Sequence, residues 1–370
     1  MTAGFVPPPY PYDRLDAFKS IASAHDGGMV DLSIGDPCDP PPSVVIEALA
    51  SSASERSYPA SIGFPTYRDA AAGWMERELG LSVGPKELAA CIGTKEFVAG
   101  LPHWLRLRSP ERDTVLYPAI SYPSYAMGAE LAGARAVPVP ITADGRSDLD
   151  AIDPSDAARA LCLWVNSPGN PTGYLDDLEA AANWGRAHGV PVISDECYVE
   201  FTWEGPRRSI LEHGLDGVLA VHSLSKRSNL AGVRAGFYTG DGDLVHYLSE
   251  LRKHAGFMVP GPVQAAAAAA WNDQAHVDVQ RARYLERLEL FRRILAGIGV
   301  EAPMPGGAFY LWAPAPSSDS WGLVERLAAD GGALVSAGEF YGPEGSPFIR
   351  VAVVQSTERL ELVGRRLGVL

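Results

Sequence analysis

Short runs of consecutive apolar residues recur through the middle of the chain, and helical patterns separate them. The runs lie at residues 114–117, 161–165, 190–194 and 217–221. Two of the helical patterns lie between them at residues 122–131 and 175–188. Strands without polar alternation indicate a parallel sheet covered by helices on both faces. The pattern therefore predicts an α/β fold with a mostly parallel central sheet.

The hydrophobic pattern changes after residue 297. Strands are expected at residues 308–312, 333–335 and 348–354, and helices at residues 321–329 and 357–367. This is an α+β pattern, which indicates a second and smaller domain. We expect an N-terminal arm that contributes to the small domain at residues 1–45, a large α/β domain at 46–275, and the small C-terminal domain at 276–370.

Polar residues follow three of the apolar strands directly, at residues 166–173, 195–198 and 223–226. The carboxyl ends of parallel strands meet at one edge of a sheet, and ligands of such folds bind outside that edge. We therefore expect the polar residues of these three segments to form one site.

Lys226 differs from the other lysines because it alone directly follows an apolar strand. The chain has only five lysines, Lys19, Lys86, Lys95, Lys226 and Lys253. A lysine amine can form a Schiff base with a carbonyl, and hydroxyls with a guanidinium bind phosphate. Ser223, Ser225, Lys226 and Arg234 thus suggest a phosphorylated aldehyde, pyridoxal phosphate; a surface loop that merely contains these residues is the alternative.

Three other positions each have two interpretations. Thr94 and Lys95 open a helix after a glycine turn, which offers a phosphate site or routine capping of the helix by Thr94. Gly35 ends a short strand, either as an ordinary turn or to let the backbone approach a ligand. Arg350 lies inside an apolar strand, where it pairs with an internal acid or binds a carboxylate ligand.

Composition excludes several classes of partner. The 370 residues are 46% hydrophobic, enough for a large core, and the formal net charge is −14, which argues against nucleic acid or an anionic membrane as main partner. No segment has the length and apolarity of a membrane span or signal peptide. The four cysteines contain no C-x-x-C pair, so neither a metal site nor a disulfide framework is indicated, and a cytoplasmic location is expected.

Four motifs together resemble the class I/II pyridoxal-phosphate-dependent aminotransferases of fold type I, over nearly the whole chain. They are Asn170-Pro171-Thr172-Gly173, Asp195-Glu196-Cys197-Tyr198, Ser223-Leu224-Ser225-Lys226 with Arg234, and Arg350. Each motif alone is weak, but the ordered and spaced set is specific. The resemblance implies a fold-type I architecture, pyridoxal phosphate bound by the large domain, and amino-acid and keto-acid substrates.

The resemblance implies roles for the residues around the cofactor ring. Lys226 resembles the Schiff-base lysine, which also shuttles a proton. Asp195 resembles the carboxylate that pairs with the pyridinium nitrogen and keeps the ring an electron sink. Tyr198 and Asn170 resemble the residues that hydrogen-bond the phenolate oxygen, and Tyr122 resembles the aromatic that stacks on the ring.

The resemblance also implies a phosphate cup, a substrate clamp and a partner subunit. The phosphate cup is implied at Thr94, Lys95, Ser223, Ser225 and Arg234, with Lys95 at a position where this family often has a small residue. Arg350, Asn170 and the backbone of Gly35 resemble the clamp for the substrate α-carboxylate. Tyr58 resembles a tyrosine that reaches the phosphate of the neighbouring subunit, which implies a homodimer with shared active sites.

A narrower resemblance concerns the substrate. Segments 9–15, 30–37, 222–232, 252–256 and 338–342 are similar to the actinobacterial-type succinyldiaminopimelate aminotransferases of lysine biosynthesis. This implies ping-pong transfer of an amino group between glutamate and N-succinyl-2-amino-6-oxopimelate. Ser228, Asn229, Lys253 and His254 are candidates for contacts with this long, multiply anionic substrate.

Other functions remain open at this stage. The same cofactor site would serve an aspartate or LL-diaminopimelate aminotransferase, or a carbon–sulfur β-lyase. A non-catalytic protein with this fold is disfavoured by the intact set of lysine, aspartate, tyrosine and arginine. A dinucleotide-binding protein is disfavoured because no G-x-G-x-x-G follows a first strand.

Overall fold

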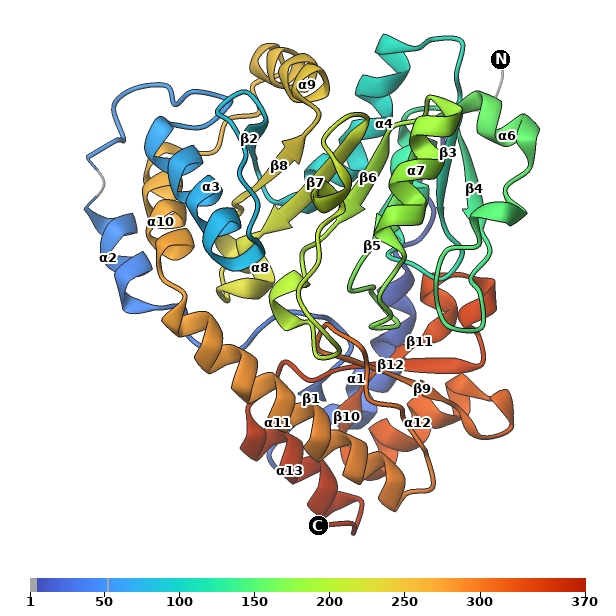
Figure 1. Ribbon diagram of the computed structural model, residues 1–370. Coiled ribbons are helices and arrows are strands. Elements are labelled where there is room, and N and C mark those ends of the chain that lie inside the picture. Colours follow the sequence, from blue (N-terminus) through green and yellow to red (C-terminus); the bar gives the residue numbers. More distant parts are fainter. Residues whose placement is uncertain (1–4, 52) are drawn as a thin grey trace.

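The computed structural model describes residues 5–51 and 53–370, so the first four residues of the predicted N-terminal arm lie outside the described residues. A seven-stranded sheet in this part of the chain has the order β2-β8-β7-β6-β5-β3-β4 (Figure 1). Its strands are β2 (Leu88–Cys91), β3 (Thr114–Pro118), β4 (Arg135–Val139), β5 (Ala160–Asn166), β6 (Val192–Asp195), β7 (Val218–Ser223) and β8 (Gly236–Gly240). Within this sheet β8 runs in the opposite direction to the other strands, which are parallel to one another, and this confirms the predicted mostly parallel sheet.

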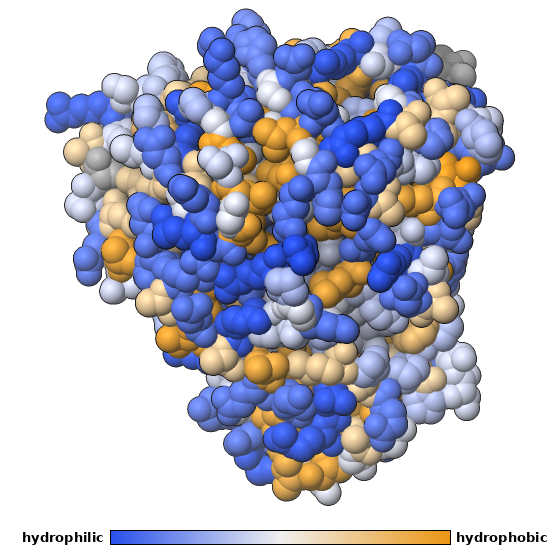
Figure 2. Space-filling view, viewed as in Figure 1, coloured by the Kyte–Doolittle hydropathy of each residue, from blue (hydrophilic) through white to orange (hydrophobic). Residues whose placement is uncertain are grey.

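Helices cover both faces of this sheet, as the unbroken apolar strands predict. One face packs against α3 (Pro65–Leu79), α7 (Leu178–His188) and α10 (Gly261–Asn272), with α2 (Ser43–Ala50) beside α10. The other face packs against α4 (Thr94–Arg108), α5 (Ser124–Leu131) and α9 (Gly242–His254). All residues of β5, β6 and β7 are buried. On the surface in Figure 2, apolar residues are interspersed with hydrophilic ones.

The C-terminal third forms two smaller sheets below the large one in Figure 1. The first has the antiparallel order β11 (Ser336–Ala337), β12 (Phe348–Ala352) and β9 (Tyr310–Pro314). The second pairs β1 (Val30–Asp31) with β10 (Ala333–Leu334), so the N-terminal segment joins the C-terminal sheets. The surrounding helices are α1 (Asp16–Ser23), α11 (Ala275–Gly297), α12 (Ser320–Gly331) and α13 (Thr357–Arg366). The domain boundaries after residues 45 and 275 stay a prediction.

Several elements differ from the sequence-based expectations. The helix expected over residues 175–188 begins at Leu178, because the Asp177 side chain accepts a hydrogen bond from the backbone N–H of Ala180 and caps it. Strand β8 was not expected, since glycines at both of its ends weaken the strand signal. Two short helices complete the chain, α6 (Pro154–Arg159) and α8 (Leu224–Arg227).

The parallel register of β5, β6 and β7 positions the predicted site. Asn166 at the end of β5 lies beside Asp195 at the end of β6, and Asp195 lies beside Val221 of β7. Helix α8 follows β7 at once, so Lys226 reaches the same edge of the sheet. No helix in the described ranges has the length and apolarity needed to cross a bilayer.

Candidate active site

A cavity of about 360 Å³ opens at the carboxyl edge of the large sheet, where the C-terminal sheets meet it. It is lined by Gly35, Thr94, Lys95, Tyr122, Asn170, Asp195, Tyr198, Ser223, Ser225, Lys226, Arg234 and Arg350, together with Tyr10, Tyr12, Ile34, Asn166, Cys197, Ala231 and Tyr310. The cavity thus brings together every residue predicted for the cofactor and for the α-carboxylate clamp except Tyr58.

Asp195 lies at the floor of the cavity and is held on both carboxylate oxygens. Oδ2 accepts a hydrogen bond from the Tyr125 hydroxyl at 2.9 Å, and Oδ1 accepts one from the backbone N–H of Cys197 at 3.2 Å. Burial raises the pKa of Asp195, although both hydrogen bonds and the nearby Lys226 amine oppose that shift. A fixed, buried carboxylate is suited to binding a cationic ring nitrogen.

Lys226 projects its amine into the cavity from the first turn after β7. The amine donates a hydrogen bond to the carbonyl of Gly35, which comes from the N-terminal segment. Burial lowers the pKa of Lys226 to about 8, against a smaller opposing effect of the Asp36 carboxylate. The amine therefore has a large neutral fraction near pH 8, as a nucleophile or proton acceptor requires.

The hydroxyl of Tyr198 forms a hydrogen bond with the hydroxyl of a second tyrosine, Tyr310. The Tyr198 and Tyr310 hydroxyl oxygens are 2.8 Å apart, and burial raises the pKa of both phenols, that of Tyr310 to about 12. Both phenols are therefore protonated donors at neutral pH. Gly35 packs against this pair so closely that a Cβ atom there would lie 2.2 Å from the Tyr310 hydroxyl, so the position requires glycine.

Hydroxyls and a guanidinium gather at one end of the cavity. The Ser223 and Ser225 hydroxyl oxygens are 3.0 Å apart, and Arg234 Nη1 lies 3.4 Å from Ser225 Oγ. Helix α4 begins beside them at Thr94, and no side chain of the described residues caps its N-terminus, so routine capping by Thr94 was the wrong interpretation. A Cβ at Gly93 would lie 2.2 Å from Arg234, so glycine lets the guanidinium close on the helix start.

Arg350 reaches the cavity from β12 and is 2% exposed. Nη1 donates to Asn170 Oδ1 at 2.7 Å, and Nη2 donates to the carbonyl of Ser33 at 2.5 Å. The faces of Tyr310 and Tyr341 flank the guanidinium, whose carbon is 4.3 and 4.8 Å from their ring centres. Internal pairing with an acid, the alternative for Arg350, is not found in the described part of the chain.

Lys95 lies among tyrosines rather than among the serines of the predicted phosphate cup. Its amine is 5.5 Å from the ring centre of Tyr10. Burial lowers the pKa of Lys95, but the phenols of Tyr122 and Tyr10 outweigh it, so the net shift is upward. Among the residues that the structure describes, no carboxylate forms an ion pair with this amine.

The donor set fits pyridoxal phosphate. Ser223, Ser225, Arg234 and the uncapped start of α4 form an anion site. Lys226 and Asp195 supply the amine and the carboxylate that the aldehyde and the ring nitrogen need. The anion site and the Lys226 and Asp195 side chains line a single cavity, so one molecule with a phosphate, an aldehyde and a ring nitrogen can contact all of them at once.

Some predicted residues lie elsewhere. Tyr58 is 94% exposed and lines a separate surface pocket with Pro260 and Pro262. Ser228 is fully buried and bonded to Arg227 and His276, and Lys253 forms an exposed ion pair with Glu250. Asn229 and His254 do not line the cavity either, so the expected substrate contacts of these four residues are not found within it.

Other cavity residues escaped the sequence analysis. Tyr310 and, behind the cavity, Tyr125 lie in strand and helix patterns that are typical of core aromatics. Asn166 holds the loop by donating to the carbonyl of Asp195 at 2.7 Å and accepting from the Asn170 N–H at 2.8 Å. Its place at a strand end had put Asn166 among the polar residues expected to form the site, but without a role.

Comparison with known proteins agrees with this geometry. The model of the family "Aminotransferase class I and II" matches residues 27–367. The transaminase OxyQ of Streptomyces rimosus, named for 4-dedimethylamino-4-oxo-anhydrotetracycline, is 40% identical, with 97% of this chain and 99% of the relative covered. An LL-diaminopimelate aminotransferase of Desulforudis audaxviator is 35% identical, with 97% and 95% covered.

A solved structure extends the agreement to the whole fold. The probable N-succinyldiaminopimelate aminotransferase of Thermus thermophilus superimposes with a TM-score of 0.86 at 30% identity, over 97% of this chain and 100% of that one. The family model and the relatives each span nearly the whole chain. The chain therefore belongs to the class I and II aminotransferases, which have fold type I and depend on pyridoxal phosphate.

Proposed function

We propose that this aminotransferase moves an amino group between glutamate and N-succinyl-2-amino-6-oxopimelate by a ping-pong mechanism. One observation carries the proposal, the charge of the cavity. Lys95, Lys226, Arg234 and Arg350 line it, but Asp195 is the single carboxylate in the lining. A cation-rich cavity in a chain of net charge −14 favours anionic ligands.

The four cations can be divided by the groups that they face. Arg234 accompanies the serines of the anion site, and Lys226 is the reactive amine. Arg350 and Lys95 are then left for the substrate. Glutamate carries two carboxylates, and the succinylated keto acid carries one beside the reacting carbonyl and others far from it. Arg350 would bind the carboxylate beside the reacting carbon, and Lys95 a distal one.

In this proposal each residue has a limited task. Bound pyridoxal phosphate supplies the electron sink that stabilises charge after the α-proton leaves. Ser223, Ser225, Arg234 and Thr94 would hold its phosphate, Asp195 its ring nitrogen, Tyr198 and Asn170 its phenolate oxygen, and Tyr122 its ring face. Lys226 Nζ takes the α-proton and returns it to the product side. The phenol of Tyr198 and the guanidinium of Arg350 keep the substrate oriented between them.

The proposal includes a homodimer with shared active sites. Tyr58 is almost fully exposed in one subunit and lies outside its own cavity. An exposed tyrosine beside Pro260 and Pro262 is a suitable contact for a second copy of the chain. Tyr58 would then reach the cofactor phosphate of that copy.

A second candidate is transfer to or from LL-diaminopimelate. The relative from Desulforudis audaxviator bears that name, and the same Arg350 and Lys95 would serve its two amino-acid ends. OxyQ is named for a polycyclic ketone at still higher identity, so identity alone does not select the acceptor. The choice depends on the reaction itself.

A panel of half-reactions tests the proposal. Holoenzyme would be mixed separately with glutamate, aspartate, N-succinyl-LL-diaminopimelate, LL-diaminopimelate and cystathionine, and the loss of visible cofactor absorbance recorded. Fast conversion by glutamate and the succinylated compound supports it. Conversion by free LL-diaminopimelate but not by the succinylated compound favours the second candidate, and pyruvate from cystathionine without a keto acid would indicate a β-lyase.

A further inference from the structure

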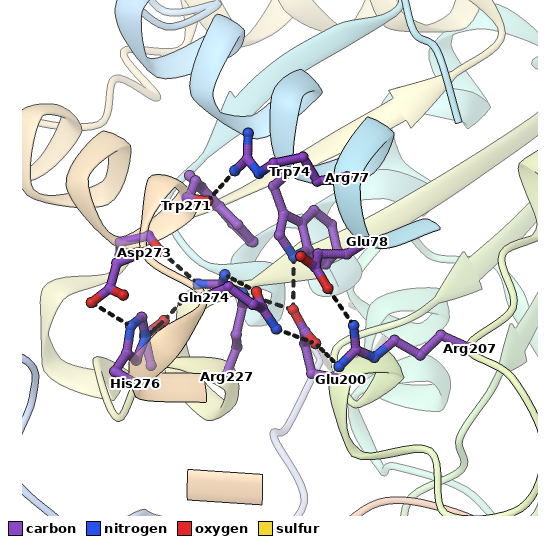
Figure 3. Close-up of polar contacts among 12 residues, drawn as sticks. Trp74, Arg77, Glu78, Glu200, Arg207, Arg227, Trp271, Asp273, Gln274 and His276 are labelled. Carbon is purple, nitrogen blue, oxygen red and sulfur yellow. Dashed lines mark hydrogen bonds and ion pairs between the residues drawn. The ribbon is translucent and has the colours of Figure 1, made fainter. Parts of the chain in front are cut away.

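Arg227, which directly follows Lys226 in α8, does not line the cavity and instead extends toward Glu200 and Gln274 (Figure 3). The side chain is 2% exposed. Its guanidinium donates to Glu200 Oε1 at 3.1 Å, to Gln274 Oε1 at 2.9 Å and to the carbonyl of Ala270 at 2.7 Å. A cation whose hydrogen bonds are all made inside the protein thus lies directly beside the reactive lysine.

Two tryptophans enclose the same guanidinium. Its carbon lies 5.6 Å from the ring centre of Trp74 and 4.9 Å from that of Trp271. The Trp74 indole also donates a hydrogen bond to Glu200 Oε1 at 2.7 Å. Aromatic walls exclude water, so the ion pair is stronger and more sensitive to geometry than an exposed one.

The pair continues outward as a network of alternating charges. Arg207 donates to Glu200 Oε2 at 3.1 Å and to Glu78 Oε2 at 2.6 Å (Figure 3). Exposure of the side chains rises from 2% for Arg227 and Glu200 to 20% and 19% for Arg207 and Glu78. Each charge in this network has an opposite neighbour.

The pair connects the two segments that deliver the reactive groups. Arg227 belongs to α8, which has four residues, too few to be stable alone, so its orientation depends on its contacts. Glu200 belongs to the 3-10 turn Val199–Phe201, which begins immediately after Tyr198. The Arg227–Glu200 contact thus fixes the segment of Lys226 against the segment of Tyr198 from behind.

Stability alone is a poor reason for this arrangement. A buried ion pair seldom gains more than it loses in desolvation, and neutral residues of similar shape often replace it without loss of stability. What such a pair does supply is one defined geometry, because both partners need several hydrogen bonds at fixed angles. Sites that bind a reactive atom depend on supporting contacts of this kind.

We propose that Arg227 and Glu200 are positioning residues, which hold Lys226 and Tyr198 at the spacing that the bound cofactor requires. The inference rests on the proposed roles of Lys226 and Tyr198. It assigns Arg227 no contact with substrate or cofactor. The pair acts through the two segments that it joins.

The test compares Arg227→Met, Glu200→Gln and the double variant with wild type. Three quantities are measured on each: melting temperature without cofactor, kcat with glutamate, and the pH midpoint of the visible cofactor absorbance. Glu200→Gln leaves the buried Arg227 without a carboxylate, and Arg227→Met leaves Glu200 with Arg207 as its remaining cation, so the melting temperature of each single variant falls. The double variant leaves no such charge, so its melting temperature recovers. Arg112→Met is the matched control, because Arg112 holds two backbone carbonyls, of Ala160 and Gly189, away from the cavity.

If Arg227 and Glu200 are positioning residues, the double variant should recover the wild-type melting temperature but not the wild-type kcat or absorbance midpoint. Its kcat is expected to stay roughly tenfold below wild type, since small misplacements of reacting groups are costly. Its absorbance midpoint is expected to stay shifted by about half a pH unit. A double variant with wild-type kcat and midpoint would overturn the inference, as would an equal midpoint shift in Arg112→Met.

If the methionine variants do not fold, Arg227→Lys decides. It keeps the charge but loses the planar fork, so kcat and the midpoint should shift in the same direction by less. Wild-type values for both in that variant would overturn the inference. Failure of the proposed function is recognised separately, because wild-type protein would then not convert glutamate and the succinylated compound in the half-reaction panel, whereas the absorbance midpoint is measured without substrate.

Discussion

The cations on the two sides of the Lys226–Arg227 peptide differ in whether they have an ion-pair partner. On the cavity side, Lys226, Lys95, Arg234 and Arg350 have no ion-pair partner in the described part of the chain. On the other side, Arg227 enters a run of acids and bases in which every charge is paired (Figure 3). The two arrangements begin at adjacent residues of one short helix.

The difference indicates which charges hold the protein together and which await a ligand. A charge removed from water must be paired or lose its ionisation, so unpaired cations persist only where solvent or a bound anion reaches them. In an acidic protein, acids to pair with are abundant. Cations left without them therefore mark positions for the anionic groups of cofactor and substrate.

Loss of Lys226 should have the largest effect. Lys226→Ala removes both the amine that binds the cofactor and the base that moves the α-proton, so turnover should fall about a thousandfold or more. The visible absorbance of the bound cofactor should change at the same time. Lys253→Ala, at an exposed lysine paired with Glu250, is the control and should leave both unchanged. Full activity in Lys226→Ala would exclude it as the reactive lysine.

Loss of Arg350 should mainly weaken binding. Arg350→Ala removes a buried, charge-assisted contact to the substrate carboxylate, for which about 3 kcal/mol, or a hundredfold rise in KM for glutamate, is expected. Arg350→Lys should recover only part of that loss, because the ammonium cannot form two parallel hydrogen bonds. An unchanged KM for glutamate in Arg350→Ala would contradict both its role in binding carboxylate and the inference that unpaired cations of the cavity bind anionic groups.

A third arrangement of titratable groups is an acid and a base that are buried side by side and uncharged. Glu196 Oε2 and His222 Nε2 are 3.4 Å apart, and neither atom has a hydrogen-bond partner in the described residues. Burial raises the pKa of Glu196 to about 8 and lowers that of His222 to about 3. Both groups are therefore neutral in the folded protein at pH 7.

This neutrality predicts a pH-dependent loss of stability. Because the folded pKa of Glu196 exceeds its usual 4.5, its contribution is complete below pH 4.5 and is lost as the pH rises to about 8. Glu196→Gln keeps the shape and does not titrate. The free energy of unfolding of wild type should fall relative to that variant by on the order of 2 kcal/mol between pH 5 and 8. A constant difference between the two would show that Glu196 is ionised when folded.

Sequence patterns predicted the sheet and most of the cavity for a physical reason. Apolar strands with polar residues at their carboxyl ends leave little freedom in where those residues meet. Tyr310 and Tyr125 were missed because an aromatic that completes a site has the same periodicity as one in a core. Ser228 was misassigned as a substrate contact because successive helical residues point about 100° apart, so the direction of Lys226 says nothing about that of the residues that follow it.

Strand β8 and the position of Lys95 could not be predicted, because both depend on contacts between segments far apart in the sequence. Gly236 and Gly240 concealed a fully buried strand, whose pairing with β2 and β7 only the tertiary structure determines. The family resemblance assigned Lys95 to the phosphate cup, at a position where the family often has a small residue. Its amine instead lies over Tyr10, a residue from the N-terminal segment whose position no local pattern specifies.

Substitution of Lys95 should have the smallest effect on KM, and it separates the part of the cavity that binds the cofactor from the part that binds the substrate. The Lys95 side chain is exposed and solvent screens its amine, so Lys95→Met should raise KM for glutamate about tenfold at low salt and less at high salt. KM for alanine, which lacks a distal carboxylate, should not change. If Lys95 instead binds the cofactor phosphate, KM for both amino acids and the affinity for pyridoxal phosphate would change together. Measuring these three quantities on one variant therefore decides whether the fourth unpaired cation belongs to the cofactor or to the substrate.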